Sequence, residues 1–127
     1  MAHVLLHFPV SGHRFAPLAA RAAECAGEHQ RFSEFIERVF EKQDSLGLKP
    51  WSEFASESGI RDTAVFAQCM RSKDPLPALD RGARIGRALG VQGTPTVIIN
   101  GWQFRGVPPD TLFERIVRDL LAGRAPF

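Results

Sequence analysis

The two cysteines, Cys25 and Cys69, are the side chains of this sequence best suited to nucleophilic or redox chemistry. They are too far apart for a Cys-x-x-Cys motif, and two cysteines are too few for a small disulfide framework. The pattern favours two buried, inert thiols that pack as small apolar residues. A structural disulfide is the alternative, and it requires only that the two α-carbons lie within about 7 Å. A third hypothesis is catalytic use of Cys25 or Cys69.

The four histidines raise the question of a metal site, because imidazole is a common metal ligand: His3, His7, His13 and His29. No cysteine flanks them in ligand order. His3 and His7 would point the same way on a strand, which gives at most a weak, adventitious site. We therefore expect neither a metal nor another cofactor.

A second cluster of informative residues lies near the end of the chain. Gly93-Thr94-Pro95 stands directly before the β-branched run Thr96–Ile99, and Asn100-Gly101, the strongest two-residue hairpin signal, follows it. Trp102–Phe104 then predicts a second, antiparallel strand. The bond before Pro95 is either cis, as in some tight turns, or an ordinary trans bond that opens the strand. Both alternatives place Gly93 to Pro95 at the entrance of a hairpin.

The elements that must position these residues are mostly helical. Val4–Phe8 is short and apolar and is closed by Pro9, which predicts a buried strand. Apolar or alanine-rich periodicity and capping residues then predict helices over about 13–26, 32–40, 52–58, 62–70, 78–89 and 110–122. Phe32, Phe35 and Phe40 are expected in the core.

The order of these elements predicts an α/β fold. One buried strand, a long helical crossover and a second buried strand imply a parallel pair joined in the right-handed sense. The expected architecture is a strand, a helical insert at about residues 13–90, a β-hairpin and a C-terminal helix. A chain of 127 residues fits one domain, so we expect a single domain over 1–127.

Composition excludes several classes of partner. The net charge is only +2, and basic and acidic residues are interspersed, so nucleic acid is not expected. The longest apolar runs are far shorter than the roughly 20 residues of a membrane span, so no membrane partner is expected either. The sequence as written predicts a cytoplasmic protein, or a periplasmic or extracytoplasmic one if a leader precedes Met1.

The sequence resembles the DsbA-like branch of the thioredoxin-fold proteins. Collinear stretches carry this resemblance over nearly the whole chain: Phe8-Pro9, the helix Ala19–Glu28, Phe32 with Phe35, Phe40-Glu41-x-Gln43, Phe66-x-x-Cys69 and Gly90-Val91-x-Gly93-Thr94-Pro95-Thr96. The resemblance implies a thioredoxin-like fold with a cis-proline loop that pairs with an extended substrate peptide. Gly93, Thr94 and Pro95 are then the substrate-binding candidates.

The resemblance also predicts what this sequence lacks. In the family, a strand and a helix that starts with Cys-x-x-Cys come before the strand expected at Val4–Phe8, and here only Met1 to His3 do. A thiol:disulfide oxidoreductase domain of this kind would be redox-impaired, or would depend on partner thiols. It would also lack a central strand, which predicts a homodimer, because unpaired strand edges recruit another chain.

Two further hypotheses remain open. The chain is alternatively a non-catalytic module that binds extended peptides or thiol-containing proteins through the cis-proline groove. It is also similar in expected fold to kappa-class glutathione transferases, which bind a tripeptide thiol, although fold does not fix function.

Overall fold

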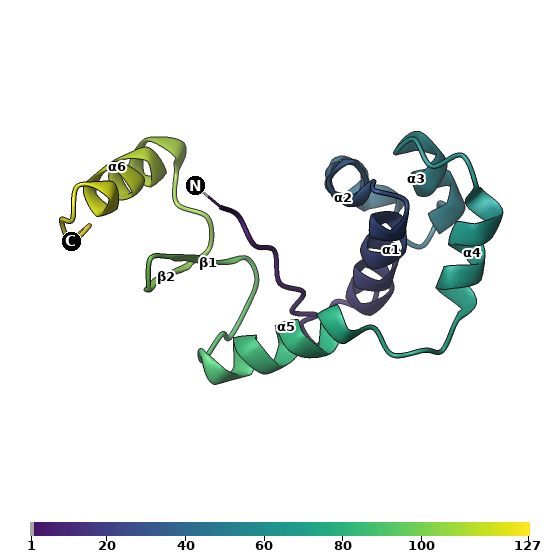
Figure 1. Ribbon diagram of the computed structural model, residues 1–127, viewed down its shortest axis with the longest axis horizontal. Helices are drawn as coiled ribbons and strands as arrows, with labels where there is room; N and C mark the ends of the chain where they lie inside the picture. The colour runs from purple at the N-terminus through teal and green to yellow at the C-terminus, as the bar shows by residue number, and fades with distance from the viewer. Residues whose placement is uncertain (1) are drawn as a thin grey trace. The chain divides into compact units, whose positions relative to one another are not determined.

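The computed structural model describes residues 2–127, which form two compact units that divide after Gly86 (Figure 1). The described chain is mostly helical and contains one β-hairpin. The single domain over 1–127 remains a prediction.

The first unit is built around four helices: α1 (Ala16–Glu28), α2 (Phe32–Glu41), α3 (Trp51–Glu57) and α4 (Thr63–Arg71). A short 3₁₀ turn, η1 (Gln43–Ser45), follows α2, and α5 (Pro77–Ala88) follows α4 and ends in the second unit. Helix α1 packs against α2 and α4, and α3 also packs against both (Figure 1). The predicted helices are confirmed, with boundaries shifted by a few residues.

Small alanines on α1 let the neighbouring helices approach closely, because their side chains fill little space. The resulting core is apolar and well buried: Ala22, Ala23, Cys25, Ala26, Phe35, Phe54, Ala55, Ile60 and Phe66. Phe35 is at its centre, with ring centroids 6.4 Å from Phe54 and 5.8 Å from Phe66. Phe35 therefore lies on the buried face of α2 that the aromatic periodicity predicts.

Phe40 departs from that periodicity. It was expected in the core, but its side chain is 67% exposed. It is five residues after Phe35, which corresponds to about 140° around the helix axis. The side chain therefore points away from the apolar face of α2, and the core assignment of Phe40 is wrong.

The segment predicted as a buried strand, Val4–Phe8, forms no strand in the structure, and Val4 is 82% exposed. His7 and Phe8 instead lie against α5, so closely that a methyl group added at Gly82 would overlap the His7 carbonyl oxygen. A methyl group at Gly86 would overlap the Phe8 ring. The strand prediction is wrong because β-propensity depends on a neighbouring strand, and residues 2–9 have no backbone hydrogen bond to another segment of the described chain.

The second unit contains β1 (Thr96–Ile99), β2 (Trp102–Arg105) and α6 (Asp110–Leu121). The strands are antiparallel, with Thr96 opposite Arg105, which confirms the predicted hairpin. Asn100 and Gly101 have positive φ angles of 50° and 87°, as a two-residue hairpin turn of the primed type requires. The Phe104 ring of β2 packs against the Phe127 ring at the end of the chain, with centroids 6.1 Å apart.

Candidate functional site

The loop that enters the hairpin is held at both of its ends. The Thr96 hydroxyl donates to the Gly93 carbonyl oxygen at 2.7 Å, and the Gly106 N–H donates to the Pro95 carbonyl oxygen at 2.9 Å. The peptide bond between Thr94 and Pro95 is cis. The first bond closes the loop on itself and the second ties it to the residue after β2, so the loop has a defined position within its unit.

Thr94 is the residue of this loop whose backbone stays open. Among the described residues, neither its N–H nor its carbonyl oxygen has a hydrogen-bond partner, and Thr94 is exposed. Such a donor and acceptor next to each other at the start of a strand can pair with an extended peptide. The structure therefore brings the three sequence candidates, Gly93, Thr94 and Pro95, into one accessible loop with an unpaired backbone edge.

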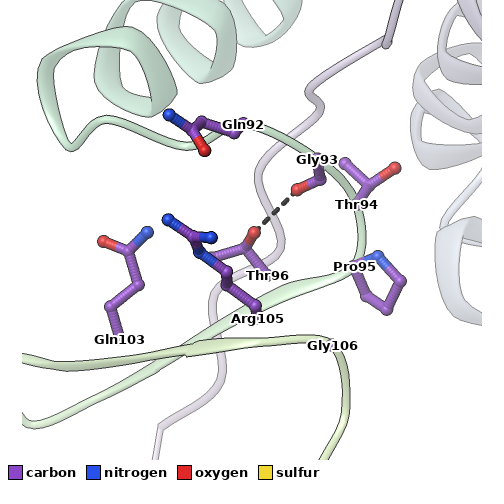
Figure 2. A pocket seen from close by; sticks show the side chains of 8 residues that line it. All are labelled: Gln92, Gly93, Thr94, Pro95, Thr96, Gln103, Arg105 and Gly106. Carbon is purple, nitrogen blue, oxygen red and sulfur yellow. Dashed lines mark hydrogen bonds between the residues drawn. The ribbon is translucent and has the colours of Figure 1, made fainter.

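A hollow of about 280 Å³ adjoins this loop (Figure 2). Its lining comes entirely from the second unit: Gln92, Gly93, Thr94, Pro95, Thr96, Gln103, Arg105 and Gly106. The lining combines apolar surface with amide, hydroxyl and guanidinium groups, so the hollow offers a ligand apolar contact together with a few specific polar partners.

Sequence reasoning missed Gln92, Gln103 and Arg105. The signal for two of them was the strand alternation, since Gln103 and Arg105 are two positions apart and therefore face the same side of β2. The register then pairs Arg105 with Thr96, which directly follows Pro95. A two-residue turn at Asn100-Gly101 already fixes this register, so the position of Arg105 opposite Thr96 follows from the predicted hairpin once β2 extends past Phe104.

The two cysteines form a disulfide, with α-carbons 5.9 Å apart. It joins α1 to α4 inside the first unit, and Cys25 is completely buried. The interpretation as two inert free thiols is therefore wrong, and the alternative of a structural disulfide is confirmed. Cys25 and Cys69 belong to the first unit, whereas Gly93, Thr94 and Pro95 belong to the second.

The four histidines do not form a cluster. His7 Nε2 lies 2.7 Å from Glu24 Oε1, and its ring meets the Phe32 ring edge-on at 5.9 Å. His29 Nε2 is buried and has no hydrogen-bond partner in the part of the chain that the structure describes. Within residues 2–127, no three His, Cys, Asp or Glu side chains are grouped so that they could hold a metal ion.

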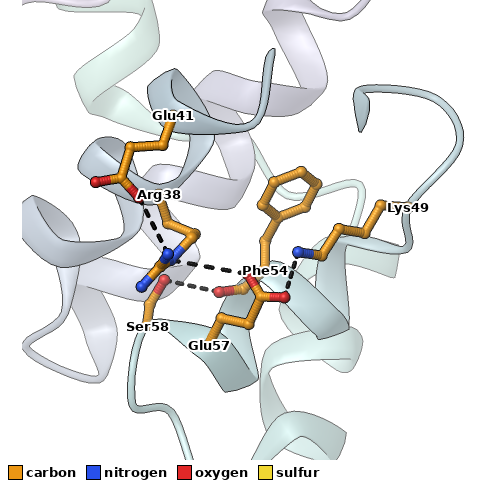
Figure 3. A network of polar contacts seen from close by, with 6 residues as sticks. All are labelled: Arg38, Glu41, Lys49, Phe54, Glu57 and Ser58. Carbon is orange, nitrogen blue, oxygen red and sulfur yellow. Dashed lines mark hydrogen bonds and ion pairs between the residues drawn. The ribbon is translucent and has the colours of Figure 1, made fainter. Parts of the chain in front are cut away.

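A network of charged side chains covers the core of the first unit near α3 (Figure 3). Glu57 pairs with Lys49 and lies 3.7 Å from Arg38, and the Lys49 ammonium sits 4.6 Å from the centre of the Phe54 ring. The hydrogen bond from Lys49 lowers the pKa of Glu57, partial desolvation opposes this, and the charges of Lys49 and Arg38 lower the pKa further. These pairs support the fold and lie outside the loop at 93–96.

Comparison with known proteins identifies the class. A protein-family model described as Thioredoxin matches residues 3–119, which is most of the chain. The chain therefore belongs to the thioredoxin family, in its DsbA-like branch.

Relatives among characterised proteins are much longer. The chain is 34% identical to the Na⁺/H⁺ antiporter NhaA 1 of Mycolicibacterium gilvum over 98% of its own length and 20% of the relative's. It is 32% identical to NhaA 1 of Mycolicibacterium vanbaalenii, again over 98% of the chain and 20% of the relative. It is 29% identical to NhaA of Herminiimonas arsenicoxydans, over 84% of the chain and 17% of the relative. The chain thus spans about a fifth of the length of these relatives.

No helix within residues 2–127 has both the length and the apolar character needed to cross a bilayer.

Proposed function

We propose that this chain is a peptide-binding module of the DsbA-like thioredoxin family that performs no thiol chemistry of its own. The loop of Gly93, Thr94 and Pro95 would receive an extended segment of a partner protein by backbone pairing. The observation that carries the proposal is the unpaired backbone of Thr94, exposed beside a polar hollow.

The pairing follows from strand geometry. An extended peptide placed along the loop would accept from the Thr94 N–H and donate to the Thr94 carbonyl oxygen, as in strand addition. Pro95 contributes no N–H, and its carbonyl oxygen is already taken by Gly106. Thr94 is therefore the residue of this loop that offers a peptide both a free donor and a free acceptor; Gly93 adds one more N–H without a partner in the described chain.

The disulfide supports the absence of redox chemistry. Thiol–disulfide exchange needs an accessible thiolate, and the described residues include no free cysteine. Cys25 is completely buried and Cys69 is partly buried, so an attacking thiol would have to approach the Cys69 sulfur. The proposal gives this disulfide a structural role, and the oxidoreductase function of the family would then require thiols from a partner.

A joint titration and turnover assay tests the proposal. Nuclear magnetic resonance of the ¹⁵N-labelled chain with an unfolded, cysteine-free peptide is expected to shift the amides of residues 92–96 and 103–106. Reduction of insulin by dithiothreitol is expected to proceed at the background rate. Turnover that disappears in Cys25→Ser or Cys69→Ser would contradict the proposal and make the chain a thiol enzyme.

Glutathione binding is a second candidate for the same loop, because glutathione is a short extended peptide with a thiol. The amide, hydroxyl and guanidinium groups of the hollow offer hydrogen-bond partners for its carboxylates and peptide groups. Retention on immobilised glutathione, with elution by free glutathione, is the result this alternative predicts. Passage through the column, together with binding of longer peptides, would leave only the peptide-binding module.

The relatives suggest a setting for the module. They are named Na⁺/H⁺ antiporters, and a stretch of each is similar to nearly the whole of this chain. We propose that the chain acts with an antiporter of this kind, whose extended segments would be its peptide ligand. Binding of the purified chain to liposomes that contain such an antiporter, compared with empty liposomes, tests this; equal binding to both would contradict it.

We also propose that the chain self-associates through residues 4–6. Val4 and Leu5 are 82% and 53% exposed in an unpaired extended segment, and apolar edges of this kind are templates for pairing with a second copy. Light scattering at micromolar concentration is expected to give the mass of a dimer. A monomeric mass, or a dimer unaffected by Val4→Lys with Leu5→Lys, would contradict the proposal.

A further inference from the structure

We propose that the hollow beside the loop binds a carboxylate, so that the preferred peptide carries an acidic group next to the segment paired with Thr94. This inference rests on the proposed peptide-binding function and names its ligand class. It follows from the charge and the side-chain chemistry of the hollow.

Arg105 is the one charged side chain among the eight residues that line the hollow. No Asp or Glu lines it, and within residues 2–127 Arg105 has no ion-pair partner. Among the arginines of the described chain only Arg31, Arg38 and Arg124 have an ion-pair partner, so what singles out Arg105 is its place in the lining of the hollow. An unpaired guanidinium facing a hollow attracts an anion, and its planar fork matches the two oxygens of a carboxylate.

Neighbouring side chains add neutral donors. Gln103 lies two residues before Arg105 on the same face of β2. Gln92, which directly precedes the loop, also lines the hollow. Figure 2 shows the guanidinium of Arg105 between Gln103 and Thr96. Amide N–H groups donate to a carboxylate without adding charge. One cation with amide donors suits a singly charged carboxylate better than a doubly charged phosphate.

The hydroxyl of Thr96 has a different role. It donates to the Gly93 carbonyl oxygen, so its proton is not available to a ligand. The bond fixes the loop directly across from Arg105, because Thr96 and Arg105 are partners in the hairpin register. The hairpin register therefore sets a fixed spacing between two groups. One is the loop that would hold the peptide backbone, and the other is the arginine that would hold the peptide carboxylate.

Affinities of three kinds of seven-residue peptide test the inference. The first kind is a series with blocked ends and a neutral valine–serine sequence, in which one glutamate occupies each position in turn. The second has glutamine in its place, and the third is the glutamine peptide with a free C-terminal carboxylate. The best glutamate peptide is expected to bind the wild-type chain about ten-fold more tightly than its glutamine counterpart, with the advantage reduced by salt.

Variants locate the effect. Arg105→Gln is expected to abolish the advantage of glutamate while leaving affinity for the glutamine peptide unchanged. Arg118→Gln, on α6 of the same unit, removes the same charge away from the hollow and is expected to keep the advantage. Loss of the advantage in both variants would show that net charge, and not the hollow, is responsible, and would overturn the inference.

The remaining outcomes separate this inference from the proposed function. Equal affinity of all three peptides would overturn the carboxylate site and leave the peptide-binding function standing. An Arg105-dependent advantage of the third peptide alone would support the site and identify the C-terminal carboxylate as its ligand. Absence of binding by every peptide would overturn the proposed function, and this inference with it.

Discussion

The helical unit up to Gly86 and the hairpin unit from Arg87 differ in how their residues are held. In the first, a continuous apolar core and a disulfide join the helices. The buried residues of the second unit, within the described chain, are Ile116 and the two prolines Pro108 and Pro126. That unit instead has a hairpin, an open loop backbone and polar side chains that face solvent.

This contrast separates stability from recognition. Buried apolar area and a covalent link stabilise the first unit, whereas the second exposes unpaired hydrogen-bonding groups that a partner can satisfy. Functional loops commonly combine exposure with a few fixed anchors. The hydrogen bonds from Thr96 and Gly106 are those anchors here.

Each unit also contains one of the two tryptophans, Trp51 and Trp102. Trp51→Phe and Trp102→Phe backgrounds therefore allow the fluorescence of each unit to be followed separately during unfolding. Trp51 fluorescence then reports unfolding of the first unit, and Trp102 fluorescence reports unfolding of the second.

The largest effect is expected from Phe35→Ala. The side chain is completely buried among other aromatic rings, so its removal leaves a cavity and should lower the free energy of unfolding by about 3–5 kcal/mol. Phe40→Ala on the same helix is the matched control, since Phe40 is 67% exposed, and should cost less than about 1 kcal/mol. Urea unfolding followed by Trp51 measures both. Equal losses would refute the core placement.

The second effect concerns the disulfide. The double variant Cys25→Ala/Cys69→Ala is expected to lower the free energy of unfolding of the first unit by about 2–4 kcal/mol, because the unfolded chain is no longer cross-linked. Peptide affinity at the loop should stay unchanged. A variant that folds but no longer binds peptide would show that the cysteines take part in the site.

The third effect tests the close approach of His7 and Phe8 to α5. Gly82→Ala is expected to destabilise the first unit by about 1–3 kcal/mol, because the new methyl group would overlap backbone atoms of His7. Gly86→Ala should cost less, since the Phe8 ring is able to move. Gly27→Ala, whose methyl group would meet Phe32 at an ordinary 3.7 Å, is the control and should be neutral or stabilising. Stabilisation by Gly82→Ala would contradict the observed packing.

The smallest effect is the pH dependence of the Glu57 pairs. Because its pKa is lowered in the folded state, mainly by the hydrogen bond from Lys49, charged Glu57 stabilises the fold at pH values above its ordinary pKa near 4.5. That contribution is lost as the pH falls through the lowered pKa. Wild type should therefore be slightly more stable than Glu57→Gln at pH 7, with the difference shrinking as the pH falls below 4.5. A difference that does not shrink in acid, or one matched by Glu37→Gln, would contradict this assignment.

Much of the hairpin unit could be predicted from the sequence, because its signals are local. Asn100-Gly101 specifies a turn with positive φ, and the β-branched run before it specifies the strand. The loop candidates Gly93, Thr94 and Pro95 followed from the same stretch. Arg105 lies one residue beyond the strand expected at Trp102–Phe104, although the two-residue turn already sets it opposite Thr96.

In the helical unit, local patterns predicted the helices but not their contacts. The pairing of Cys25 with Cys69 depends on how α1 packs on α4, which periodicity does not determine. Val4–Phe8 has strand propensity, but packing against Gly82 and Gly86 replaced strand pairing in the structure. Tertiary contacts overrode the local preference in both places.

Hydrogen exchange at the Thr94 amide tests the central claim most directly. This N–H has no partner in the described chain, so it should exchange rapidly in the free protein. Saturation with an extended peptide should slow it by about ten-fold or more, whereas the Gly106 amide, already bonded to the Pro95 carbonyl, should change little. An unchanged Thr94 rate while peptide is bound would show that the peptide does not pair with this loop and would contradict the proposed function.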